Sequence, residues 1–84
     1  MLDESLVNGL KNELEEFPKE TILKLIEGMI NDLRPDDFEL IELRFYQNKS
    51  FHEIGFILGC SENTAKVRTH RLIRRMRQRL SKQY

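Results

Sequence analysis

Four residues in the second half of this chain mark where helices begin and end. Ser50 and Glu53 have the spacing of a capping box, in which the serine hydroxyl and the glutamate carboxylate each accept a free backbone N–H at a helix start. Gly59 suits the left-handed backbone that ends a helix, and Ser61 suits the start of the next one. The sequence therefore predicts a helix over 51–58, a three-residue turn, and a second helix directly after Ser61.

The second of these helices is predicted to be long and two-faced. Nothing breaks it from Glu62 to Lys82, which gives a length of about 30 Å at about 1.5 Å per residue. At 100° per residue its apolar positions fall within about a third of the circumference, as in a helix that packs on a core. These positions are Ala65, Thr69, Leu72, Ile73, Met76 and Leu80. The rest is polar and basic except for Val67, which points outward.

Charge is distributed unevenly along the chain. The net charge over 84 residues is zero, but residues 1–59 carry six Lys/Arg and thirteen Asp/Glu, a balance of −7. Residues 60–84 carry eight Lys/Arg and one Glu, a balance of +7. An acidic body with a basic last helix indicates a polyanionic partner, and the bland alternative is a basic helix that is simply solvated.

The earlier part of the chain predicts three more helices. Apolar residues recur every three or four positions over 5–17 and over 22–33, and each stretch ends before a proline. Pro35 has the fixed φ angle that suits the first turn of a third helix, over 35–46. Alternation of strand type is nowhere sustained. We therefore expect an all-α domain of four to five helices, with one small core and a C-terminal helix-turn-helix.

A helix-turn-helix also makes a steric demand that this sequence meets. The motif needs a small residue where its first helix approaches the second, and apolar residues around the turn. Gly55 stands at the first position, and Ile54, Leu58, Cys60 and Ala65 stand around the turn. A glycine inside a helix costs about 1 kcal/mol relative to alanine, so that a close approach is a physical reason for Gly55.

Catalysis, metal binding and membrane insertion find no support in the sequence. The two histidines and one cysteine are too few and too scattered for a nucleophile with its base or for a metal site, and there is no Gly-rich phosphate loop. We therefore expect no enzyme and no cofactor. A single cysteine excludes an internal disulfide, and neither a signal peptide nor a membrane-spanning apolar run is present. A cytoplasmic protein without membrane contact is expected.

The stretch LIELRFYQNKSFHEIGFILGCSENTAKVRTHRLIRRMRQRL resembles region 4 of bacterial RNA polymerase sigma factors, specifically the extracytoplasmic-function group. The resemblance covers about residues 33–80 and is carried by LRFY, SFHEIG, LGCSENTAK and the spaced bases of the last helix. Gly55 stands where the family usually has Ala, and Val67 where a small polar residue is common. The resemblance implies a winged-helix-like, sigma region 4 type of domain over 21–84, with residues 1–20 as a linker or an additional N-terminal helix.

The resemblance also implies partners and contact residues. The last helix would bind the promoter −35 element as double-stranded DNA, and the earlier helices would hold the flap of the polymerase β subunit. The domain would act as a monomer on the polymerase, and an anti-sigma factor would be a further partner. Contacts to bases or nearby backbone are implied for Lys66, Val67, His70 and Arg71, and phosphate contacts for Asn63, Thr64, Arg68 and Arg74. Polymerase contacts are implied for Leu25, Phe38, Ile41, Leu43, Phe45 and Phe51.

Two experimental expectations and two alternatives accompany this interpretation. We expect Arg71→Ala to weaken DNA binding and relax its specificity, and Arg77→Ala to lower affinity evenly on all sequences.

One alternative is the DNA-binding domain of a LuxR-type regulator, which dimerises on paired half-sites. The other is a module whose basic helix docks on an acidic protein or an anionic lipid surface. No segment fits sigma region 2, so we expect either an excised C-terminal domain or a stand-alone region 4 protein.

Overall fold

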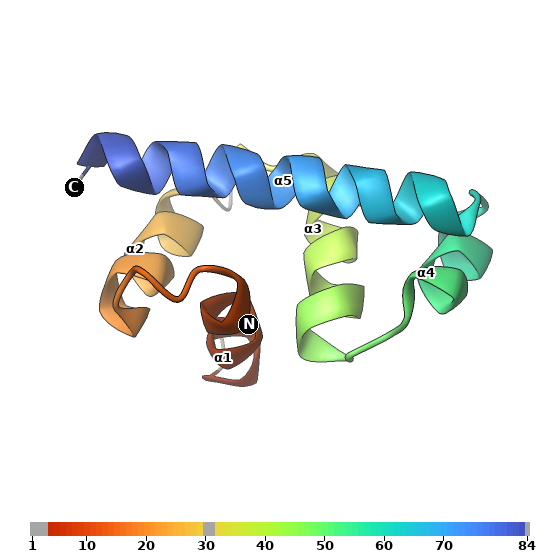
Figure 1. Ribbon diagram of the computed structural model, residues 1–84, viewed down its shortest axis with the longest axis horizontal. Coiled ribbons are helices and arrows are strands. Elements are labelled where there is room, and N and C mark those ends of the chain that lie inside the picture. The colour runs from red at the N-terminus through yellow and green to blue at the C-terminus, as the bar shows by residue number, and fades with distance from the viewer. Residues whose placement is uncertain (1–3, 30–31, 84) are drawn as a thin grey trace.

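The computed structural model describes residues 4–29 and 32–83, and this part of the chain consists of helices and their connections. The elements are α1 (Glu4–Glu13), α2 (Lys19–Met29), α3 (Pro35–Ile41), a π-helical segment η1 (Glu42–Tyr46), α4 (Phe51–Leu58) and α5 (Glu62–Gln83). The expectation of an all-α domain with a C-terminal helix-turn-helix is confirmed for these residues. The domain measures 35 × 23 × 22 Å, and α5 runs along its full length with the other helices on one side (Figure 1).

Two hydrophobic clusters lie beneath α5. The larger one joins α1, α2 and the α3–η1 helix to the C-terminal half of α5. The smaller one holds Leu40, Leu43, Ile54 and Ala65 at the helix-turn-helix. The six α5 positions predicted to face the core are all buried, which confirms the helical periodicity: Ala65, Thr69, Leu72, Ile73, Met76 and Leu80. Thr69, the one polar member, donates its hydroxyl hydrogen to the Ala65 carbonyl at 2.8 Å, so that its burial leaves no unpaired group.

The N-terminal helix is shorter than predicted but is built into the same domain. It ends at Glu13, and residues 14–17 form a turn that buries Phe17. Its buried leucines belong to the larger cluster. A β-carbon added at Gly9 would collide with the backbone carbonyl of Phe45, so that α1 lies against η1 at backbone distance. Residues 1–3 of the predicted 1–20 segment lie outside the described residues.

The second and third helices depart from their predicted lengths. The helix α2 spans Lys19–Met29 rather than 22–33, of which residues 30–31 lie outside the described part. The predicted helix over 35–46 is regular only to Ile41, and it continues as η1, where the Gln47 N–H donates to the Glu42 carbonyl at 2.9 Å. Leu43 enters the smaller cluster and Phe45 the larger one. The α3–η1 helix therefore stands between the two clusters and contributes to both.

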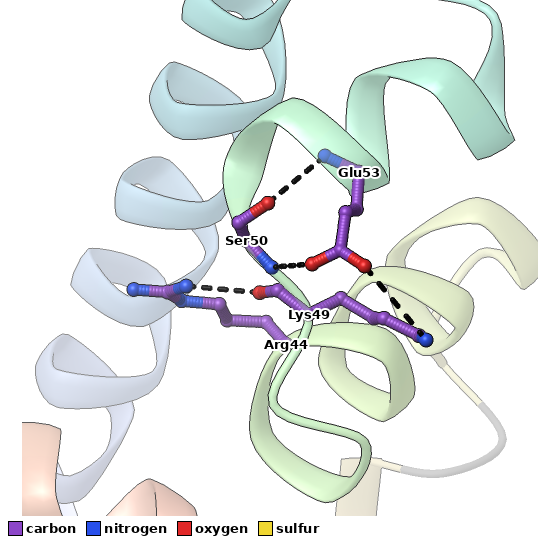
Figure 2. A network of polar contacts seen from close by, with 4 residues as sticks. All are labelled: Arg44, Lys49, Ser50 and Glu53. Atoms are coloured by element: carbon purple, nitrogen blue, oxygen red, sulfur yellow. Dashed lines mark hydrogen bonds and ion pairs between the residues drawn. The ribbon is translucent and has the colours of Figure 1, made fainter.

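The predicted start and end signals of the helix-turn-helix are confirmed. Ser50 Oγ accepts the Glu53 N–H at 3.1 Å, and Glu53 Oε1 accepts the Ser50 N–H at 3.0 Å (Figure 2). Gly59 closes α4 with a φ angle of 74°. Ser61 Oγ then accepts the Thr64 N–H at 3.0 Å at the start of α5. Local hydrogen bonds and the left-handed Gly59 therefore define the start and end of α4 and the start of α5.

Candidate nucleic-acid interface

The part of α5 from Asn63 to Arg74 presents a polar and basic surface to solvent. We call this surface the reading face and define it by eight residues: Asn63, Thr64, Lys66, Val67, Arg68, His70, Arg71 and Arg74. All of them are exposed except Arg68, which is half-buried. Val67 is 37% exposed, so that one apolar side chain is in contact with solvent among basic side chains. The structure therefore brings together on one face the residues for which the sequence implied DNA contacts.

One residue of the reading face is held by packing from below. The Phe51 ring lies edge-on to the His70 ring, with 6.0 Å between the ring centroids and an angle of 87°. The Phe51 ring also carries the Arg44 guanidinium, 4.0 Å from the ring centroid. Arg44 also donates to the Lys49 carbonyl at 2.9 Å (Figure 2). The loop before α4 is thereby fixed, and it supports the aromatic ring against which His70 rests.

The arginines of α5 differ in whether they pair with the acidic body. Four of them form ion pairs: Arg68 with Asp36 at 4.0 Å, Arg75 with Asp37 at 2.9 Å, Arg77 with Glu16 at 3.1 Å, and Arg79 with Asp32 at 3.9 Å. Arg71 and Arg74 form no ion pair with another described residue. Exposed ion pairs contribute only about 0–1 kcal/mol each to the free energy of unfolding. Their main effect here is that they partly neutralise these four arginines. The two arginines of α5 without an ion pair to a described residue, Arg71 and Arg74, both lie on the reading face.

Arg77 lies elsewhere than expected for a residue that contacts DNA. Besides its ion pair with Glu16, it donates to the backbone carbonyl of Glu13 at the end of α1. Both partners lie on the flank of α5 that faces α1. Arg77 thus joins α5 to the N-terminal helix, and we now expect its removal to lower stability rather than DNA affinity.

Most residues with implied polymerase contacts lie inside the domain. Leu25, Ile41 and Phe45 are buried in the larger cluster and Leu43 in the smaller one, each at most 6% exposed. Phe38 and Phe51 are partly exposed. The reason is that a helical apolar period marks buried positions without telling whether the covering surface belongs to the same chain. Only Phe38 and Phe51 of this set offer surface to a partner in this conformation.

Two surface features were missed by sequence reasoning. Phe56 is 88% exposed and Ile57 48% exposed, both on α4. The signal was present, because α4 is apolar on more sides than Ile54 and Leu58 account for. The second feature is Arg34, which borders a hollow beside α5 together with four arginines of that helix. No local sequence pattern connects Arg34 with α5, because the two are brought together only by the fold.

Comparison with known protein families assigns the chain. The family described as "Sigma-70, region 4" matches residues 23–76, from within α2 to the last third of α5. The chain belongs to this family. Sigma region 4 is a DNA-binding helix-turn-helix domain of sigma factors, which act in transcription initiation, and it is not a catalytic family. No curated protein and no solved structure shows a significant match to the chain.

Among the described residues no three His, Cys, Asp or Glu side chains are grouped so that they could hold a metal ion. No described helix is long and apolar enough to cross a membrane. The helix α1 lies before the matched span, yet it packs into the larger cluster with matched residues such as Ile26 and Phe45.

Proposed function

We propose that this sigma region 4 domain binds the promoter −35 element as double-stranded DNA through the reading face, while docked on RNA polymerase. The observation that carries the proposal is the exposure of Val67 among basic side chains on the second helix of a helix-turn-helix. The second helix of this motif enters the major groove with its N-terminal residues toward the bases. An apolar side chain there is suited to a thymine methyl group, whereas simple solvation would favour a polar residue.

The proposed roles within the reading face follow from position along α5. Lys66, Val67, His70 and Arg71 contact base edges or nearby backbone, because they point outward in the first turns of the helix. Asn63, Thr64, Arg68 and Arg74 contact phosphates, which set register and affinity but carry no sequence information. The −7 charge of residues 1–59 repels the duplex and turns α5 toward it.

The proposal includes a contact with the flap of the polymerase β subunit. Phe38 and Phe51 are its candidate anchors, since they alone among the implied residues are partly exposed. The domain acts as a monomer in this arrangement, because the polymerase rather than a second copy supplies the additional affinity. An anti-sigma factor is proposed as a competing partner. This role requires a cytoplasmic location and no membrane contact.

The test is selection of binding sites from random duplex DNA at two salt concentrations, with and without an isolated β-flap fragment. We expect one short asymmetric site, enriched more strongly when the flap is present. Arg71→Ala should weaken binding to that site and relax preference at one base position, by about 1–3 kcal/mol of discrimination. Lys24→Ala, which removes an exposed charge from α2 far from the reading face, is the matched control and should bind like the wild type.

Three results would contradict the proposal. Paired half-sites that are selected without the flap would instead support a LuxR-type dimeric regulator. Equal losses on every DNA sequence for Arg71→Ala would remove its role in base recognition. An absence of any enriched site under all conditions would leave the basic helix as a surface for acidic proteins or anionic lipids.

A further inference from the structure

A basic furrow runs along one flank of α5. Its first part is a hollow of about 550 Å³ between α5 and the start of α3, bordered by five arginines: Arg34, Arg68, Arg71, Arg74 and Arg75. A second hollow of about 290 Å³ continues it toward the C-terminus, shares Arg34 and Arg75, and adds Arg79 and Lys82. These seven basic side chains define the basic furrow. Only two acids, Asp32 and Asp37, border it.

The furrow has the length of a track rather than of a pocket for one small anion. Five of its six α5 members follow one another at spacings of three or four residues and so share one side of the helix: Arg68, Arg71, Arg75, Arg79 and Lys82. The sixth, Arg74, lies toward the reading face. At about 1.5 Å per residue the distance from Arg68 to Lys82 is about 21 Å. A DNA strand carries one negative charge per about 3.4 Å of duplex axis, so the furrow is long enough for several consecutive phosphates.

The guanidinium groups in the furrow retain unused donors. Arg75 and Arg79 each have one carboxylate partner, Asp37 at 2.9 Å and Asp32 at 3.9 Å. An arginine has five N–H donors, so a single carboxylate leaves most of them available. Arg34 is exposed and forms no ion pair with another described residue. Arginine is the residue best suited to phosphate, because its planar fork donates two parallel hydrogen bonds.

We propose that the basic furrow binds the sugar–phosphate backbone of DNA next to the bases contacted by the reading face. The proposal rests on the proposed function and extends it to Arg34, Arg75, Arg79 and Lys82. Continuity decides in favour of DNA over an acidic protein segment. Arg68, Arg71 and Arg74 belong to both the reading face and the furrow, so that a duplex seated on one brings its phosphates to the other.

The two acids of the furrow compete with the DNA. Asp32 and Asp37 occupy arginine donors that phosphates would otherwise take, and their charge repels the backbone. Glu16 forms an equivalent ion pair with Arg77 on the opposite flank, outside the furrow. The pair Asp32 and Glu16 therefore distinguishes an effect of the furrow from a general effect of removing one negative charge.

The experiment measures the affinity of the whole chain for a fluorescent duplex that contains its selected site, as a function of salt. The plot of log K against log salt has a negative slope. We expect Arg34→Ala and Arg79→Ala each to make this slope shallower by about 0.9, as for one lost phosphate contact. Both should weaken binding equally on selected and random sequences. Arg77→Ala, the matched arginine on the other flank, should leave the slope near that of the wild type. Asp32→Asn should raise affinity, whereas Glu16→Gln should not.

Duplexes shortened at the flanks locate the contact. If the furrow holds flanking backbone, Arg34→Ala and the wild type should bind equally to a duplex trimmed of those phosphates. If the salt slopes of Arg34→Ala and Arg79→Ala equal that of Arg77→Ala, the furrow does not bind DNA backbone. The wild type would still select a DNA site in that case, so the proposed function would stand. Unchanged DNA binding with weakened binding to polyglutamate would assign the furrow to an acidic protein instead. If the wild type selects no DNA site at all, the proposed function fails first. Circular dichroism confirms that each variant is folded.

Discussion

Gly55 lies so close to the chain after the turn that a β-carbon added to it would stand 2.6 Å from the carbonyl oxygen of Cys60. Cys60 belongs to the turn that separates α4 from α5, and its N–H donates to the Gly55 carbonyl at 2.8 Å. Gly55 therefore allows a close approach as predicted, but to the backbone of the turn residues Cys60 and Ser61 rather than to the second helix itself. It lets the turn that leads into α5 pack directly against α4.

A side chain at position 55 should push this turn away from α4. Gly55→Val is expected to lower the free energy of unfolding by about 1–3 kcal/mol, because overpacking against backbone cannot be relieved by a rotamer change. Urea denaturation measures the effect. Gly28→Ala is the matched control, since a β-carbon at Gly28 meets nothing within 4 Å, and it should be neutral or stabilising by up to about 1 kcal/mol. Equal effects of the two substitutions would refute the close approach.

Val67 should affect base preference without affecting stability. It is 37% exposed and lies outside both hydrophobic clusters, so Val67→Ser should change the free energy of unfolding by no more than about 0.5 kcal/mol. On the proposed function, the same change should alter preference at one position of the selected site. Site selection with the variant checks this result, with Lys24→Ala on the exposed side of α2 as a control. An unaltered site would remove Val67 from base recognition.

Arg77 and Glu16 should be coupled in stability. Their ion pair joins the C-terminal half of α5 to the residues after α1, with both side chains about half exposed. A double-mutant cycle with Arg77→Ala and Glu16→Gln should give a coupling energy of about 0.2–1 kcal/mol, which is the range of exposed pairs, and it should shrink at high salt. Strictly additive effects of the two substitutions would show that the pair contributes nothing.

The capping box should weaken in acid. The Ser50 backbone N–H that Glu53 accepts, and secondly the Ser50 hydroxyl, hold the pKa of Glu53 below its ordinary value of 4.5. A lowered pKa in the folded state means that the ionised carboxylate stabilises the fold above pH 4.5, and that this contribution is lost as the pH falls through the folded-state value.

Thermal denaturation of wild type and Glu53→Gln from pH 7 to pH 3 measures this contribution. The wild type should melt at a higher temperature near neutral pH, and the difference should disappear in acid. Glu27→Gln serves as the control, because the Glu27 side chain is exposed and makes no hydrogen bond to another described residue. A difference between wild type and Glu53→Gln that is the same at every pH would contradict the role of the charge.

Local signals in the sequence were the most informative. Ser50, Gly59 and Ser61 predicted the limits of α4 and the start of α5, because caps depend on hydrogen bonds within a few residues. The apolar period of α5 predicted its buried side completely. By contrast, the predicted helix over 35–46 changes to a π-helical turn at Glu42, where α1 packs at backbone distance. A contact with a segment more than 30 residues away leaves no local trace in the sequence.

The candidate site divides in the same way. Most of the reading face could be placed from one helix, because 100° per residue predicts which positions point outward. The resemblance to sigma region 4 supplied Thr64 and Arg68. The basic furrow could not be placed from one helix, because Arg34 reaches α5 only through the fold. The implied polymerase contacts at Leu25 and Phe45 show the opposite limitation. Their hydrophobic character was evident, but only the structure shows that α1 and α5 already cover them.

The helix α5 closes both hydrophobic clusters, since Leu72, Met76 and Leu80 complete the larger one and Ala65 the smaller one. This arrangement has a consequence for synthesis on the ribosome. Leu40 and Ile54 stay uncovered until the start of α5 has emerged, and Leu10 and Ile22 until its end has emerged. The nascent domain therefore exposes apolar surface until α5 has been synthesised, and it can acquire its cooperative stability only after the codons for α5 have been read.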